Sequence, residues 1–117
     1  MKAGMLVFAS AALAALIGVS VWATSHIGVI PAIRDLLDNP TAVYNPWFIA
    51  TLFDAYFGFL WFWLWVAYKE PHWVVRGIWL ILILVLGNMA MAAYVLLALA
   101  RLPADATIED LLLRRKA

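Results

Sequence analysis

The chain has 117 residues, of which 68% are hydrophobic, 15% aromatic and 13% charged, and its formal net charge is +1. Soluble domains are roughly 45–50% apolar and about 25% charged, so this composition indicates an integral membrane protein, and the near-neutral charge excludes an extended basic face for nucleic acid. The absence of cysteine excludes disulfides, thiolate metal sites and iron–sulfur clusters.

The first apolar run covers residues 3–24 and carries no charge. About 20 apolar residues span the roughly 30 Å hydrocarbon core of a bilayer, so the run predicts a transmembrane helix. A cleavable signal peptide is the competing interpretation, because Lys2 gives a basic start and Val21-Trp22-Ala23 resembles a cleavage site; the length of the run favours retention. Small residues recur every four positions and predict a helix-packing face: Ser10, Ala14 and Gly18.

The connection that follows contains an amphipathic segment at about 31–38. Pro31 suits a first helical turn, and Asn39-Pro40 stops the helix. The apolar residues of this segment share one helical face, which predicts a short helix lying at the membrane surface.

Two further runs predict transmembrane helices at about 46–68 and 77–101. Only eight residues, Lys69 to Arg76, connect them, so we expect an antiparallel hairpin. The charges of this loop are expected to form its solvated face. The predicted fold is a single all-α membrane domain with three transmembrane helices.

The tail at about 105–116 carries an apolar strip and closes on three basic residues, which predicts a second surface helix. Three spans place the N-terminus and the 69–76 loop on one side and the tail on the other. The count of basic residues then favours a cytoplasmic tail, whereas the first helix, which usually dominates, favours a cytoplasmic N-terminus. We expect a multi-pass protein of a bacterial inner membrane, and between these opposed arguments we favour the cytoplasmic N-terminus.

Asp54 is the one formally charged side chain well inside a predicted span. A carboxylate there costs about 2.5–3.5 kcal/mol on insertion scales, so it needs a partner or a proton. Aligning the two helices of the hairpin places Asp54 between the depths of Asn88 and Tyr94 and predicts a hydrogen bond to one of them. Two interpretations stay open: a polar clamp that fixes the hairpin register, or a proton or ligand site that also uses Thr51 and Tyr56.

Nine of the sixteen residues from Phe53 to Tyr68 are aromatic. Interfacial anchoring and helix packing account for most such stripes, but Trp61 lies deeper than interfacial rings usually do and shares a helical face with Trp65. With Phe57 these rings are compatible with a slot for a quinone, a carotenoid or a lipid, although the sequence requires no cofactor. Gly58 and Gly87 are predicted helix-packing positions of the hairpin.

Residues of both predicted hairpin helices resemble a family of small bacterial and plant membrane proteins catalogued as domain of unknown function fourteen-seventy-five. The resemblance covers about half the chain and rests on Asn45-Pro46-Trp47-Phe48-Ile49-Ala50-Thr51-Leu52-Phe53-Asp54-Ala55-Tyr56-Phe57-Gly58, Trp65-Val66-Ala67-Tyr68-Lys69-Glu70, Trp73, Trp79, Gly87-Asn88 and Ala93-Tyr94. It implies the same hairpin, with an Asp in its first helix, and it implies no activity, substrate or cofactor.

The sequence contains no catalytic constellation. His26 and His72 fall at opposite membrane faces, so one monomer cannot use both as ligands of one metal. The sequence shows no Ser–His–Asp set, paired carboxylates or glycine-rich phosphate loop. We therefore predict a non-enzymatic packing or accessory subunit that forms homo-oligomers or joins other membrane subunits in the lipid bilayer and binds no nucleic acid. The alternative is a membrane-embedded enzyme or proton-coupled carrier that uses Asp54.

Overall fold

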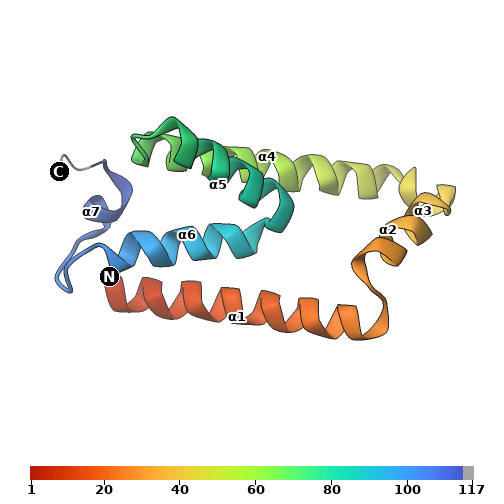
Figure 1. The fold of residues 1–117 in the computed structure, drawn as a ribbon, viewed down its shortest axis with the longest axis horizontal. Coiled ribbons are helices and arrows are strands. Elements are labelled where there is room, and N and C mark those ends of the chain that lie inside the picture. Colours follow the sequence, from red (N-terminus) through yellow and green to blue (C-terminus); the bar gives the residue numbers. More distant parts are fainter. Residues whose placement is uncertain (115–117) are drawn as a thin grey trace.

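The computed structural model describes residues 1–114, and all regular structure in this part of the chain is helical (Figure 1). Its helices in chain order are α1 (Lys2–His26), α2 (Val29–Leu37), α3 (Pro40–Val43), α4 (Pro46–Lys69), α5 (Trp73–Leu86), α6 (Asn88–Ala100) and α7 (Ile108–Leu112).

The helices α1 and α4 are long and apolar enough to cross a membrane, with 25 and 24 residues. They run in opposite directions, and α2 and α3 connect them at one end of the molecule (Figure 1). Asn45 begins α4 because its Oδ1 accepts hydrogen bonds from the amides of Trp47 at 2.9 Å and Phe48 at 3.3 Å, while Pro46 occupies the first helical turn. The sequence and the structure therefore agree on two long apolar helices.

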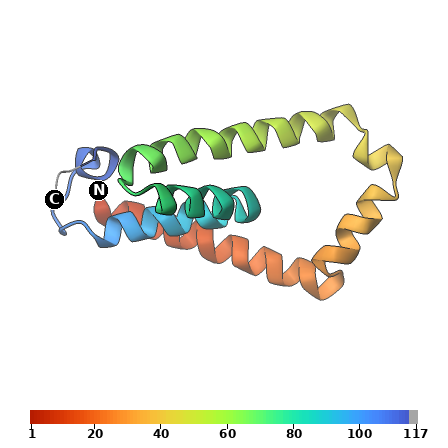
Figure 2. The same ribbon diagram turned by 45° about the horizontal axis from the view of Figure 1, so that its top comes forward.

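The third predicted span is not one helix. Gly87, with φ +58° and ψ −126°, divides it into α5, of 14 residues, and α6, of 13. Glycine adopts this backbone conformation readily and other residues rarely do. The chain reverses there, so α5 lies beside α4 and α6 returns beside α1 (Figures 1 and 2). By helix rise α5 and α6 are each about 20 Å long, too short for the roughly 30 Å core, so the expectation of a continuous span at 77–101 is wrong.

This reversal brings the C-terminal segment to the same end as the N-terminus (Figures 1 and 2). Lys2 Nζ donates to the carbonyl of Leu102 at 2.6 Å, and Lys69 Nζ donates to that of Leu111 at 2.5 Å. The expected placement of the tail opposite the N-terminus is therefore wrong. A capping box between Thr107 and Asp110 starts α7, and the predicted tail helix beyond residue 114 lies outside the described residues.

The core occupies the half of the molecule nearest the termini, where the α5–α6 hairpin lies against α1 and α4 (Figure 2). One cluster of buried residues contains Val66, Ile83, Ala90 and Tyr94, and a second contains Ala98, Leu99 and Leu111. In the most apolar stretch of 18 residues of α1, only 6% is buried inside the protein, and the same share is buried in α4. Both long helices therefore direct most of their apolar side chains outward.

Candidate functional site

A polar cluster at the end of α4 centres on Glu70, the residue that caps this helix. Glu70 is 8% exposed, and its Oε1 accepts hydrogen bonds from Tyr94 Oη at 3.1 Å and Arg101 Nη1 at 3.4 Å. Arg76 Nε donates to the Glu70 backbone carbonyl at 2.6 Å. A buried carboxylate needs such partners, and here they come from α6 and the residues beside it. The expectation that the loop charges are simply solvated is wrong for Glu70.

Aromatic rings fix Tyr94, which is 2% exposed. The rings of Phe62, Trp65 and Trp79 meet the Tyr94 ring nearly edge to face, with centroid distances of 6.2, 5.5 and 5.0 Å. Such pairs contribute about 0.5–1.5 kcal/mol each beyond the burial of area. They hold the Tyr94 hydroxyl toward Glu70.

The tail is tied to the same end of α4. Trp65 Nε1 donates to the carbonyl of Leu112 at 2.9 Å, and Arg114 Nε donates to that of Tyr68 at 2.6 Å. The predicted aromatic slot is therefore only partly assembled. Phe57 and Trp61 line a shallow hollow of about 380 Å³ on the outer face of α4, whereas Trp65 lies apart from them against Tyr94 and the tail.

Asp54 lies on the exposed surface of α4, and within residues 1–114 it makes no hydrogen bond or ion pair. The hairpin tip at Gly87 packs on Phe59, so Asp54 is about 7.5 Å farther along α4, beyond the tip. The predicted hydrogen bond between Asp54 and either Asn88 or Tyr94 is not formed, and the Tyr94 hydroxyl donates to Glu70 instead. Its two predicted neighbours interact elsewhere: the Thr51 hydroxyl donates to the Trp47 carbonyl at 2.7 Å, and the Tyr56 ring packs on Phe59.

Of the predicted helix-packing positions, Gly87 lies against the Phe59 ring, and the others are exposed on the surface of the protein. Ser10, Ala14 and Gly18 are exposed, and a Cβ at Gly18 or Gly58 would meet nothing within 4 Å. The helix α1 packs on α6 through its other face, where Ala9 is buried. Only a molecule outside the described chain could use the outward stripe.

The hairpin tip leaves backbone groups unsatisfied. Gly87 N–H donates to the Ile83 carbonyl and Met91 N–H to the Gly87 carbonyl. Among the described residues nothing accepts from the amides of residues 88–90, and nothing donates to the carbonyls of residues 84–86. The exposed Asn88 side chain adds a further polar group at this tip.

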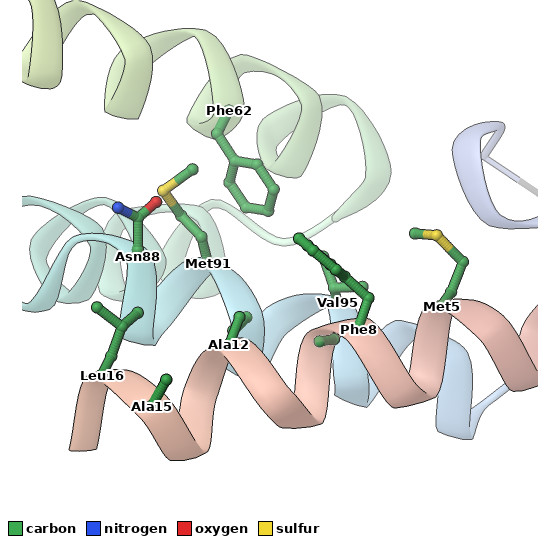
Figure 3. A pocket seen from close by; sticks show the side chains of 11 residues that line it. Met5, Phe8, Ala12, Ala15, Leu16, Phe62, Asn88, Met91 and Val95 are labelled. Carbon is green, nitrogen blue, oxygen red and sulfur yellow. The ribbon is translucent and has the colours of Figure 1, made fainter. Parts of the chain in front are cut away.

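An apolar cavity of about 510 Å³ lies between α1, α4 and α6 (Figure 3). Six residues of α1 between Met5 and Leu16 line it, with Phe62 from α4 and four residues of α6 between Asn88 and Val95. Asn88 is the only polar side chain in this lining. Elsewhere, residues 1–114 hold no group of three or more His, Asp or Glu side chains that could bind a metal.

Together these features define a small all-α protein with two candidate membrane-spanning helices and a half-length helical hairpin between them. The family model described as "Protein of unknown function (DUF1475)" matches residues 2–117, so the chain belongs to this family. The family resemblance found in the sequence is confirmed and extends over nearly the whole chain. No curated protein and no solved structure matches the chain significantly.

Proposed function

We propose that the protein is an accessory subunit of a membrane protein complex. In this proposal α1 and α4 cross the bilayer, and the α5–α6 hairpin enters the bilayer from one side. The outward apolar surface supports the location, because a core helix of a soluble protein would be mostly buried, while Trp47 is 82% exposed and Phe8 73%. The half-length hairpin is compatible with a bilayer where protein or water covers its tip.

The charge distribution supports an orientation with both termini in the cytoplasm. Among residues 1–114, one basic residue, Arg34, lies near the α2–α3 end. Five lie at the end that carries the termini: Lys2, Lys69, Arg76, Arg101 and Arg114. The positive-inside rule assigns the richer side to the cytoplasm. The conflict between the first helix and the charge count disappears, because both arguments now favour the same side.

The observation that carries the proposed role is the set of unsatisfied polar groups around the hairpin tip, which the proposed placement puts inside the bilayer. Each unpaired backbone group in hydrocarbon costs several kcal/mol, and irregular backbone persists there only under a cover of protein or water. The amides at the start of α6, the Asn88 side chain and the Asp54 carboxylate all lack partners within residues 1–114. A membrane helix from a second subunit, bearing hydrogen-bond donors and acceptors, would satisfy them and cover the exposed half of α4.

Site-specific photocrosslinking in native membranes tests this role. A photoreactive residue at Thr51, one turn from Asp54, should give one discrete protein adduct, which disappears when Asp54 is replaced by alanine. The control is the same probe at Ile81, which is 64% exposed on α5, lies about 9 Å before the tip by helix rise, and should react with lipid. Mass spectrometry of the adduct distinguishes a second copy of this chain from another subunit. Lipid adducts alone at both positions would contradict the role.

A proton-coupled carrier is the second candidate function, and one observation favours it. Asp54 holds nothing together inside the chain, so the clamp interpretation has no support within residues 1–114. Asp54→Asn separates the two functions, because asparagine keeps hydrogen bonding but cannot exchange a proton. An accessory subunit should keep the Thr51 adduct and its cellular role, whereas a carrier should lose its role and keep its thermal stability.

A further inference from the structure

We propose that the cavity between α1, α4 and α6 binds one acyl chain of an anionic phospholipid, taken from the leaflet on the side of the termini. This proposal rests on the proposed membrane location. It concerns the cavity lining and the basic residues at its shallow end, and it shares only Asn88, at the hairpin tip, with the surface proposed for assembly.

The dimensions of the cavity select a single hydrocarbon chain. From Met5 to Leu16 the α1 wall rises about 16 Å, close to the depth of one leaflet in a core of roughly 30 Å. A cavity of about 150 Å³ accepts benzene, or about 25 Å³ per carbon, so 510 Å³ accommodates about 20 carbons. A helix about 10 Å wide would need about 1,250 Å³ over the same length, more than twice the space present.

The lining allows a chain to enter sideways from the bilayer. The side chains of Ala9, Ala12 and Ala15 are short, so α1 projects little into the cavity. On the other side of the cavity the flexible Met91 projects from α6 toward Phe62 of α4 (Figure 3). Phe8 is 73% exposed, so the wall on this side is open to lipid. A chain can therefore reach the cavity without any opening of the helical core.

The charges place the headgroup at the shallow end. Lys2 lies one turn before Met5 on the same face of α1, and within residues 1–114 its ammonium bonds to the Leu102 carbonyl and to no carboxylate. The nearby Arg101 side chain contacts Glu70 but is still 69% exposed. At the deep end Asn88 offers an uncharged amide. A headgroup that carries a phosphate is therefore favoured at the Lys2 end.

Native mass spectrometry of delipidated protein in mild detergent, titrated with phosphatidylglycerol or phosphatidylcholine, tests the site. We expect one tightly bound lipid per chain and a preference for phosphatidylglycerol. Ala12→Phe fills the cavity and should weaken binding at least tenfold, whereas Ala14→Phe, on the exposed opposite face, should leave it unchanged. Lys2→Gln should weaken phosphatidylglycerol binding about fivefold, as expected for one basic residue at a membrane surface, and Arg34→Gln should have no effect.

Several results would overturn the site. Equal binding by wild type and Ala12→Phe, or equal losses in Ala12→Phe and Ala14→Phe, would place the lipid elsewhere. Equal affinities for the two lipids would remove the headgroup assignment, and a co-purified quinone that displaces the lipid would replace the proposed ligand. If Ala12→Phe does not fold, a diazirine-labelled phosphatidylglycerol on wild type decides: labels must fall on peptides 5–16 and 91–95. Loss of the Thr51 adduct would leave these results unaffected, so the two proposals fail separately.

Discussion

Gly87→Ala should destabilise the protein through two effects at one position. A residue other than glycine at φ +58° and ψ −126° costs about 1–3 kcal/mol in the backbone. The new Cβ would also lie 2.9 Å from Phe59 Cζ and 3.4 Å from two further ring atoms, and such overpacking typically costs 1–3 kcal/mol. The expected loss of about 2–6 kcal/mol is a large part of the 5–15 kcal/mol that stabilises an ordinary domain.

Reversible unfolding of the purified variants in mixed micelles measures this loss. Gly58→Ala is the matched control, because nothing lies within 4 Å of a Cβ there, and alanine should stabilise α4 by about 1 kcal/mol. In a Phe59→Ala background, Gly87→Ala should show only the backbone part of the loss, because the ring that the new Cβ meets is then absent. A Gly87→Ala variant as stable as Gly58→Ala would refute the assignment of the chain reversal to Gly87.

The same substitution also tests the course of the chain. The sequence has no cysteine, so a single cysteine at Ala104 reports the location of the segment after α6 without background. In wild type we expect it to react with a membrane-impermeant maleimide only from the cytoplasmic side, and a cysteine at Asp38 only from the other. If Gly87→Ala relieves its strain by joining α5 and α6 into one helix, the cysteine at Ala104 should change sides.

Three further substitutions test the cluster around Glu70 at the end of α4. Tyr94→Phe keeps the ring contacts and removes a hydrogen bond to a buried carboxylate, so unfolding should show a loss of about 1.5–3 kcal/mol. Arg101→Gln should cost no more than about 1 kcal/mol, because that side chain is 69% exposed; a larger loss than for Tyr94→Phe would contradict the hydrogen-bond geometry. Trp65→Phe removes the bond to the Leu112 carbonyl and should make the tail more sensitive to limited proteolysis, with the helices before it unchanged.

The two long helices could be predicted from the sequence because one physical requirement decides them. A run of about 20 apolar residues with almost no charge satisfies its backbone only as a helix when it lies in lipid. The predicted runs at 3–24 and 46–68 correspond to α1 and α4 within a few residues. The short helix predicted at 31–38 corresponds to α2, which begins two residues before Pro31 and ends before Asn39-Pro40.

The break at Gly87 could not be predicted with the same argument. Residues 77–100 carry no charge and are apolar apart from Asn88 and Tyr94, and a glycine inside a helix costs only about 1 kcal/mol, which is too little to end it. The packing of Gly87 on Phe59 and of α6 on α1 decides the reversal, and both are contacts between segments far apart in the chain. The pair Gly87-Asn88 in the middle of the run was the one local signal, because glycine is common just after the end of a helix.

The prediction of a continuous third helix also accounts for the wrong partner predicted for Tyr94. The sequence predicts Tyr94 as a polar site residue, but it pairs Tyr94 with Asp54 because it aligns a continuous third helix with α4. Once α6 reverses, Tyr94 moves away from the depth of Asp54 to that of Glu70. Glu70 was missed because a charge in a short loop is usually solvated, whereas this one is 8% exposed.

Gly87 therefore divides the polar groups of the protein into two sets. By reversing the chain it brings Tyr94 and Arg101 to Glu70, so the polar groups at the end with the termini have partners and stabilise the fold. The same reversal ends α5 and α6 at the tip and leaves Asp54 about 7.5 Å beyond it, with no segment among residues 1–114 to pair with. At the proposed location in lipid these groups require a partner, so we expect the proposed second subunit to bind the half of the protein away from the termini.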